Sequence, residues 1–319
     1  MIGSRRRTER FEPVDGRVHI GSVTLRSPVL TASGTAGYGT ELAPYVDLST
    51  IGAVVTKSIA HFQWDGNPAP RVHTVPAGMV NAVGLQGPGV RHWLDDELPA
   101  LIDTGADIVC SIWGRSVDDY AKVAAMLANA PKQVVAVEVN LSCPNLEGRG
   151  SMFAHDARLS AEVIAASADC GRPLWAKLSP NTDRIIEVAS AVASAGAEAV
   201  TMVNTLLGMV YDRTTFRPVL GNGGGGVSGP AIHPIAVRAV ADVRSALHDL
   251  PIIGVGGIVD GWSAAEFFIA GANAIQVGTA TFAEPAAVGR IQGELFDLVA
   301  SRGCASMVEF AEHIRRAAR

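Results

Sequence analysis

Short apolar runs alternate with longer amphipathic stretches along nearly the whole chain. Eight of these runs carry apolar residues on both faces, which is typical of strands in a parallel sheet that helices cover. The expected strands span residues 29–32, 53–56, 107–112, 134–141, 174–179, 199–204, 252–256 and 274–278. Between them, helical patterns predict helices at residues 117–130, 157–169, 183–195, 231–248, 263–270 and 286–301.

The joins between these elements repeat one pattern. Residues 104–109, 195–200 and 270–275 each place a glycine after a helix, then a tight turn, then an apolar strand. A glycine just past a helix end supplies the left-handed residue that closes the last turn. Eight strand–helix units predict a single (β/α)₈ barrel, of the α/β class, over residues 16–319. The alternative is an open doubly wound sheet, but no dinucleotide fingerprint follows the first strand.

Three local signals refine this fold. Residues 18–25 read as a β-hairpin, which we expect to plug the bottom of the barrel. Residues 1–15 hold a basic cluster with no apolar segment behind it, and we expect a mobile, solvated arm there. Thr182–Asp183 and Ser263 are suited to cap the helices that follow them, because their oxygens accept hydrogen bonds from free backbone N–H groups.

Composition excludes several classes of protein. Hydrophobic residues make up 48% of the 319 residues and charged residues 18%, which rules out a disordered chain. The net charge of −5 argues against nucleic-acid binding through bulk electrostatics. No uncharged apolar run reaches membrane-spanning length, so we expect no membrane partner. The four cysteines form no close pair in the sequence, so the sequence indicates neither a zinc site nor a disulfide framework. This cysteine usage favours a protein of the reducing cytoplasm.

Two lysines stand at the carboxyl ends of expected strands, where barrel enzymes place their chemistry. Lys57 follows the second strand, and Lys177 lies within an otherwise apolar fifth strand. A buried ammonium group is costly unless its charge has a partner. A salt bridge to a neighbouring carboxylate is the plain explanation, but no strand end supplies an obvious one. We therefore expect an anionic ligand as the counter-charge.

Glycines gather at the last strands of the predicted barrel. The helix expected at residue 231 follows a glycine run at 223–226 and Gly229, and further glycines end strands seven and eight at Gly256, Gly257 and Gly278. Glycines there let backbone N–H groups approach a phosphate closely, and a helix N-terminus adds its positive dipole. No Walker-type lysine follows, so the pattern predicts a phosphate that is held rather than transferred.

Cys143 differs from the other cysteines in its position. Cys110, Cys170 and Cys304 read as small buried fillers, whereas Cys143 lies in a loop just past the fourth strand, between asparagines 140 and 145. A thiol in that place can act as a nucleophile or a general base. No histidine is placed to activate it, so a nearby cationic site would have to tune its pKa.

These motifs together resemble class 1 dihydroorotate dehydrogenase. The matching segments are residues 56–58, 66–71, 81–86, 140–145, 203–205 and 226–232, and they occur in family order within residues 16–283. The resemblance implies an FMN-binding (β/α)₈ barrel that oxidises dihydroorotate to orotate in pyrimidine biosynthesis. Competing interpretations are a dihydropyrimidine dehydrogenase, a phosphosugar aldolase or isomerase barrel with Lys177 as Schiff-base former, and a non-catalytic binding barrel. Asn145 disfavours the first, because that family has histidine there.

The resemblance also assigns roles to single residues. Cys143 matches the general base that removes the C5 proton of the substrate. The residues that match substrate contacts are Lys57, Asn81, Ala82, Val83, Gly84, Leu85, Asn140, Asn145, Asn204 and Thr205. Those that match FMN contacts are Ser33, Lys57, Ser58, Asn140, Lys177, Val203, Gly229, Gly256, Gly257, Gly278 and Thr279. Asparagine donates and accepts hydrogen bonds together, which suits the edge of a dihydropyrimidine.

The subclass follows from further details. In its cysteine base and its hydrophilic N-terminus, the chain resembles class 1 enzymes. Its residues 81–86 look most like the corresponding segment of class 1B. That class implies a separate iron–sulfur and FAD subunit that passes electrons to NAD, and a homodimeric core. Two departures stand out: Ser111 replaces an asparagine that usually contacts FMN, and the segment 63–65 is unusual. Trp64 and Trp113 are candidates for an apolar contact with the partner.

Overall fold

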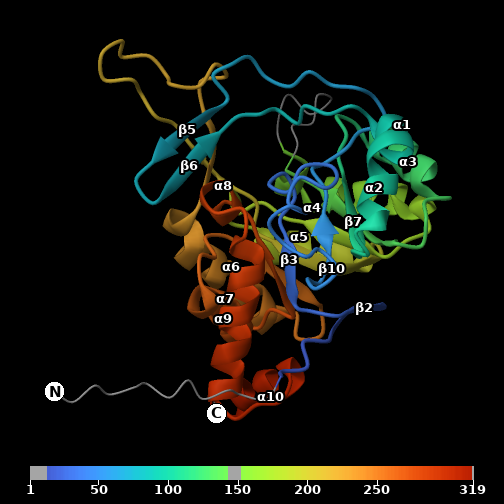
Figure 1. Cartoon of the computed structure of the whole chain (residues 1–319). Coiled ribbons are helices and arrows are strands. Elements are labelled where there is room, and N and C mark those ends of the chain that lie inside the picture. The colour runs from blue at the N-terminus through green and yellow to red at the C-terminus, as the bar shows by residue number, and fades with distance from the viewer. Residues whose placement is uncertain (1–12, 143–151, 318–319) are drawn as a thin grey trace.

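Eight parallel strands curl into a barrel in the computed structural model, which describes residues 13–142 and 152–317 (Figure 1). In spatial order they are β3 (Val29–Thr31), β14 (Ala274–Val277), β13 (Ile252–Val255), β10 (Ala197–Met202), β9 (Leu174–Lys177), β8 (Val134–Asn140), β7 (Ile108–Ile112) and β4 (Val54–Val55). The first and last of this order meet, because the Thr31 hydroxyl accepts a hydrogen bond of 2.8 Å from Val55 N–H. The predicted (β/α)₈ barrel is therefore confirmed.

Helices cover the outside of the barrel and follow the strands in sequence. The longer ones are α3 (Val117–Leu127), α4 (Ala157–Ala166), α5 (Ile185–Ser194), α6 (His233–Ala246), α7 (Gly261–Ala270), α9 (Ala287–Ser301) and α10 (Met307–Ala317). Shorter elements are α1 (Val90–His92), the π-helical η1 (Trp93–Glu97), α2 (Leu98–Asp103), α8 (Ala280–Ala283) and the 3-10 turns η2 (Phe153–His155), η3 (Ala168–Cys170) and η4 (Pro230–Ile232). The sequence did not predict the elements between residues 90 and 103, which complete the unit after β4.

The helix caps differ from the predicted ones. Helix α7 begins two residues earlier than expected, with Asp260 as its N-cap, and Ser263 completes a reciprocal capping box at the third position. Ser263 therefore contributes to the cap without being the N-cap residue. At α5 the N-cap is Arg184, whose side chain makes no capping bond. The Thr182 hydroxyl instead accepts from the Arg184 N–H at 3.1 Å, one residue outside the helix.

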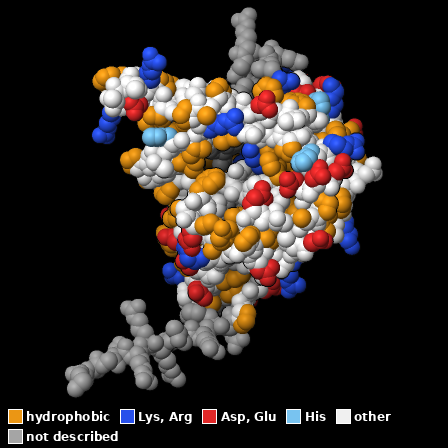
Figure 2. Space-filling view, turned by 45° about the horizontal axis from the view of Figure 1, so that its top comes forward, with side chains coloured by type: hydrophobic (Ala, Val, Ile, Leu, Met, Phe, Trp, Pro, Cys, Tyr) orange, Lys and Arg blue, Asp and Glu red, His pale blue; other side chains and the backbone are white. Residues whose placement is uncertain are grey.

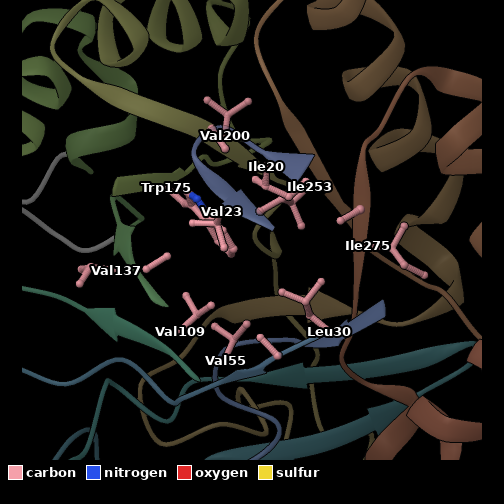
Figure 3. Packing of buried hydrophobic residues seen from close by; sticks show 14 of the residues in the cluster. Ile20, Val23, Leu30, Val55, Val109, Val137, Trp175, Val200, Ile253 and Ile275 are labelled. Atoms are coloured by element: carbon pink, nitrogen blue, oxygen red, sulfur yellow. The ribbon is translucent and has the colours of Figure 1, made fainter. Parts of the chain in front are cut away.

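An N-terminal hairpin lies against one end of the barrel, as predicted. It consists of β1 (Val18–Ile20) and β2 (Val23–Leu25), which alternate buried and exposed residues. Ile20 and Val23 point toward the barrel interior, among side chains such as Trp175 and Ile253 (Figure 3). The hairpin turn is fixed to the barrel where Glu198 accepts from Ser22 N–H at 2.7 Å. This end of the barrel is thereby closed.

Near the start of the described residues, Asp15 is held to the rest of the chain. Its backbone pairs with the segment before α10, since Asp15 N–H donates to Ala305 at 2.9 Å and Met307 N–H donates to Asp15 at 3.0 Å. Residues 1–12, most of the arm expected from the sequence, lie outside the described residues. Within the described ranges, no helix has both the length and the apolar character needed to cross a membrane.

A second sheet of four antiparallel strands stands at the other end of the barrel, and the sequence did not predict it. Its strands are, in order, β11 (Leu206–Gly208), β12 (Gly225–Ser228), β6 (Gly78–Asn81) and β5 (Val72–Val75). In Figure 1 the hairpin of β5 and β6 lies at the end of the molecule opposite α10. Because these strands leave the barrel after β4 and β10, they form a roof over the carboxyl ends of the barrel strands.

Candidate active site

A cavity of about 830 Å³ opens between the carboxyl ends of the barrel strands and the second sheet. Its size lies within the range of about 300–1,000 Å³ that is usual for small-molecule sites. Its wall takes residues from both layers, such as Lys177 of β9 and Asn81 of β6. The space-filling view shows the surface hollowed on this side of the molecule (Figure 2). The barrel therefore has its candidate site where the fold predicts it.

Every predicted site residue that the structure describes lines this one cavity. On the predicted substrate side these are Lys57, Asn81, Ala82, Val83, Gly84, Leu85, Asn140, Asn204 and Thr205. On the predicted cofactor side they are Ser33, Ser58, Lys177, Val203, Gly229, Gly256, Gly257, Gly278 and Thr279. Cys143 and Asn145 lie outside the described residues, although Ser142, which immediately precedes Cys143, also lines the cavity. The separate role of each residue stays a prediction.

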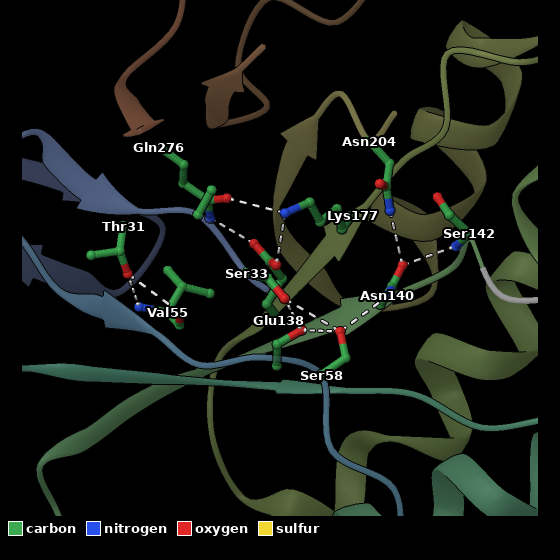
Figure 4. Close-up of polar contacts among 12 residues, drawn as sticks. Thr31, Ser33, Val55, Ser58, Glu138, Asn140, Ser142, Lys177, Asn204 and Gln276 are labelled. Carbon is green, nitrogen blue, oxygen red and sulfur yellow. Dashed lines mark hydrogen bonds and ion pairs between the residues drawn. The ribbon is translucent and has the colours of Figure 1, made fainter. Parts of the chain in front are cut away.

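Asparagine side chains form the centre of the polar wall. Asn204 donates from Nδ2 to Asn140 Oδ1 at 3.2 Å, and Asn140 donates from Nδ2 to Ser58 Oγ at 3.2 Å (Figure 4). Asn140 Oδ1 also accepts from Ser142 N–H at 3.1 Å. Its position at the end of β8 is fixed further because Tyr120 donates to its backbone carbonyl at 2.6 Å. This chain of amides holds donors and acceptors in a fixed order along one wall.

Lys57 supplies a positive charge to the cavity. Its Nζ lies 5.2 Å from the centroid of the Tyr38 ring, within range of a cation–π interaction. Burial lowers the pKa of Lys57 from its ordinary value, and the nearby charge of Arg71 lowers it further. None of the described residues that line the cavity with Lys57 is an aspartate or a glutamate. For this lysine, an anionic ligand remains the expected counter-charge.

Lys177 corrects the prediction made for both lysines. Its Nζ lies 3.3 Å from Oε1 of Glu138, a β8 residue with no exposed surface. The strand-end pattern in the sequence does not reveal this carboxylate, because Glu138 lies within its strand and not beyond the strand end. The plain explanation, a salt bridge to a neighbouring carboxylate, is therefore correct for Lys177. The ligand is not needed as its counter-charge.

The glycines of the last strands place free backbone donors at the cavity wall. Within the described residues, the N–H groups of Gly257, Gly278 and Thr279 donate to no backbone carbonyl. Gly257 has a φ of +67°, and a Cβ there would lie 2.7 Å from the Gly229 carbonyl oxygen. The carbonyl of Gly256 is fixed by the ring of His233, at 2.9 Å from Nδ1. The loop thus exposes donors at a point where a side chain would not fit.

Comparison with known proteins identifies the family. The family model for dihydroorotate dehydrogenase matches residues 17–299. The chain belongs to the dihydroorotate dehydrogenase family. The chain is 43% identical over 296 residues to the "dihydroorotate dehydrogenase B (NAD(+)), catalytic subunit" of Geobacter sulfurreducens, covering 92% of this chain and 96% of the relative. Proteins with the same name from Trichlorobacter lovleyi and Desulforudis audaxviator are each 45% identical, over 91% and 90% of this chain and 95% and 93% of the relatives.

This membership confirms the resemblance seen in the motifs, including its class 1B character, because the relatives carry the name of the B-type catalytic subunit. The named relatives also favour dihydroorotate dehydrogenase over the aldolase, the non-catalytic barrel and the dihydropyrimidine dehydrogenase. The three described cysteines fit their expected role as fillers, since Cys110, Cys170 and Cys304 are all buried and unpaired. Burial raises the pKa of the Cys110 thiol.

The two departures from the family pattern have structural explanations. Ser111 does not line the cavity but lies directly behind it, where its Oγ is 2.9 Å from Ser58 Oγ and accepts from Ser33 Oγ at 3.1 Å. Trp113 is only 3% exposed, so it belongs to the core and cannot form the suggested partner contact. Trp64 packs edge to face against Trp113 and donates from its indole to the Gly84 carbonyl at 3.0 Å. The unusual segment at 63–65 thus supports the wall at Gly84.

Several wall residues were missed in the sequence analysis. Asn181 donates from Nδ2 to the Thr205 carbonyl at 2.9 Å and accepts from Leu207 N–H at 2.9 Å, which fixes the chain leaving β10. Its place just after the fifth strand was a signal that could have found it. Asn67 and Ser228 also line the cavity, and both lie within segments that carried the resemblance. Gln276 of β14 lies behind the wall and had no signal in the sequence.

The donors of this wall fit FMN, the flavin that the resemblance implies. Backbone N–H groups without carbonyl partners at Gly257, Gly278 and Thr279 suit a phosphate. Ser142 also lines the cavity, and its Oγ is buried without a hydrogen-bond partner among the described residues. The mixed donors and acceptors of Asn140 and Ser58 suit a heterocycle. In the part of the chain that the structure describes, no group of three acidic, histidine or cysteine side chains is placed to hold a metal.

Proposed function

We propose that this chain oxidises dihydroorotate to orotate with bound FMN, and that Cys143 is the general base. The observation that carries the proposal is the cavity at the carboxyl ends of the strands. It gathers the described residues that match both sites in this family. The reaction removes a proton from C5 and a hydride from C6 of the substrate and leaves a C5=C6 double bond. The thiolate of Cys143 takes the proton, and FMN, when bound, accepts the hydride.

The substrate side of the cavity suits an anionic pyrimidine. Lys57 supplies a positive charge for the carboxylate of dihydroorotate, because none of the described residues that line the cavity is an aspartate or a glutamate. Asn81, Asn140 and Asn204 offer both amide N–H donors and carbonyl acceptors to the ring edge. Ser142 N–H is held by Asn140, which orients the start of the loop that carries Cys143 and Asn145. These contacts orient the ring and exclude water from the reacting carbons.

The cofactor side suits the two ends of FMN. Free N–H groups of Gly257, Gly278 and Thr279 support a phosphate at the β13 and β14 ends. Lys177 lies at the floor of the same cavity and is available to the flavin ring system. A positive charge there stabilises the negative charge that a reduced flavin develops. The Asn140 side chain lies between the two sides and is shared by both.

A separate electron-transfer subunit completes the proposed enzyme. The relatives are named as catalytic subunits of an NAD(+)-dependent enzyme. We propose that an iron–sulfur and FAD subunit carries electrons from this chain to NAD, and that the catalytic chain forms a homodimer. The described residues include no cluster of ligands for an iron–sulfur centre. The cytoplasmic location expected from cysteine usage also stays a proposal.

The test combines a spectrum with an acceptor series. The purified chain should show a bound flavin spectrum and should reduce an artificial dye with dihydroorotate, but not with dihydrouracil. It should not reduce NAD until the electron-transfer subunit is added. A colourless protein that cannot be reconstituted with FMN would contradict the proposed cofactor. Efficient NAD reduction by this chain alone would contradict the proposed partner, and good turnover with fumarate would indicate a different acceptor class.

A further inference from the structure

Glu138, Lys177 and Gln276 form a closed polar cluster inside the barrel, beneath the cavity. Lys177 Nζ lies 3.3 Å from Glu138 Oε1 and donates to Gln276 Oε1 at 3.2 Å (Figure 4). Gln276 Nε2 donates to the other carboxylate oxygen, Glu138 Oε2, at 2.6 Å. The three side chains come from β8, β9 and β14, so the cluster spans the barrel interior.

The cluster is almost fully removed from water. Glu138 and Gln276 have no exposed surface, and Lys177 is 5% exposed. Only Lys177 of the three lines the cavity. An ammonium group has three N–H donors, and two of them have acceptors in Glu138 and Gln276. The remaining donor is available to a molecule in the cavity.

The fold alone does not account for these charges. A buried ion pair contributes little net stability compared with well-packed apolar side chains of the same volume. The surrounding interior of the barrel is built from such residues, including Leu30, Val137 and Ile275. A charged pair that reaches one wall of the cavity instead acts on what the cavity holds. Its net charge is near zero, whereas Lys177 alone would place a full positive charge under the ligand.

We propose that Glu138 is a positioning and charge-balancing residue that holds Lys177 at the cavity floor and thereby sets the redox potential of the bound flavin. The proposal rests on FMN as the cofactor. A reduced flavin carries more negative charge than an oxidised one, and nearby protein charge tunes it. The Glu138 carboxylate offsets part of the stabilisation that Lys177 gives to the reduced form. It therefore keeps the potential low enough to pass electrons on to a weak oxidant such as NAD.

The test removes this negative charge without changing the shape of the side chain. In Glu138→Gln the affinity for reduced flavin, divided by the affinity for oxidised flavin, should be larger than in the wild type by a factor on the order of tenfold. That ratio corresponds to a rise of about 30 mV in the midpoint potential of a two-electron couple. The potential is measured by equilibration with reference dyes, and the dissociation constant of oxidised FMN by titration of the apoprotein. Glu138→Asp retains the charge and should restore most of the wild-type potential.

A matched control separates charge from geometry. Gln276→Met removes two hydrogen bonds from the same cluster but no charge. Its shift in potential should therefore be less than a third of the shift in Glu138→Gln. A Glu138→Gln potential equal to or below that of the wild type would overturn the proposal. An equal shift in Gln276→Met would also overturn it, because geometry rather than charge would then be the cause.

Three further outcomes complete the test. If Glu138→Gln does not fold, Gln276→Glu places a second carboxyl group in the cluster, and the negative charge that this group adds when it ionises should lower the potential more at high pH than at low pH. A potential that is unchanged or raised in that variant would overturn the proposal. A wild-type chain that binds no FMN would overturn both this inference and the proposed function. A flavin-loaded wild type with no response in the variants would overturn the inference alone.

Discussion

Replacing Gly257 with alanine tests whether the glycine loop holds the flavin phosphate. The residue has a φ of +67°, which an alanine adopts at a cost of about 1 kcal/mol. Its new Cβ would lie 2.7 Å from the Gly229 carbonyl oxygen and 3.1 Å from His233 Cα, and both are backbone atoms. Since neither can rotate away, the loop must shift, and overpacking of this kind costs a further amount of about 1–3 kcal/mol.

Gly171→Ala is the matched control for the backbone effect. Gly171 has a φ of +63°, nearly the same as Gly257, but a Cβ there would meet no atom within 4 Å. It follows η3 on the outside of the barrel and does not line the cavity. Its substitution should therefore cost about 1 kcal/mol of unfolding free energy and leave FMN binding unchanged.

The assays are thermal or urea unfolding of the two apoproteins and fluorescence titration with FMN. We expect Gly257→Ala to be less stable than Gly171→Ala and to bind FMN at least about tenfold more weakly, the equivalent of about 1.4 kcal/mol. The weaker binding follows because the shifted loop misplaces its N–H donors. Equal stability losses in the two variants, together with wild-type FMN affinity in Gly257→Ala, would refute the reasoning.

Three other predictions concern the reaction and its supports. Cys143→Ala should bind FMN and orotate normally but reduce the flavin about 10²- to 10⁴-fold more slowly in stopped-flow measurements; a wild-type rate would exclude it as the base. Because burial lowers the pKa of Lys57 and a bound anion raises it again, orotate affinity should be highest when this lysine is fully protonated. It should decline, by at most about tenfold per pH unit, as pH rises through a window that begins below the ordinary lysine pKa of 10.5; titrations of Lys57→Met should lack this decline. Ser111→Ala and Ser160→Ala each remove one buried hydroxyl and should each cost about 1 kcal/mol in urea unfolding, but only the first should weaken FMN binding.

The barrel and most of its cavity wall could be predicted because both depend on patterns that are local in sequence. Strands buried on both faces read as continuous apolar runs, so β7, β8 and β9 stand out from the helices between them. In a parallel barrel, the carboxyl ends of all the strands meet at one end of the barrel. Knowing the strand ends therefore places Lys57, Asn140 and Asn204 at one site without further information.

The second sheet could not be predicted in this way. Strand β5 is largely exposed, and β12 begins with two glycines of a glycine run, so neither shows an apolar alternation. The two pair through β6, which lies about 145 residues before β12 in the chain, as in the pairing of Asn81 with Gly226. Their stability comes from each other and from a small core of Val80, Ala82 and Leu220. Contacts of such long sequence separation leave no periodic signal.

The buried polar residues show a second limit, because a residue type does not reveal its partners. Ser111 reads in the sequence as a lost amide contact to FMN. In the structure it lies behind the wall and is hydrogen-bonded to Ser33 and Ser58, which line the cavity. Ser58 in turn accepts from Asn140. Most buried hydroxyls are hydrogen-bonded, so the exchange of an asparagine for a serine is accommodated when Ser33 and Ser58, which follow β3 and β4, supply two further hydroxyls. The same argument applies to Glu138, whose charge is tolerable only because β9 and β14 bring an ammonium and an amide to it. In both cases the function of the residue lies in how it holds a neighbour that reaches the cavity.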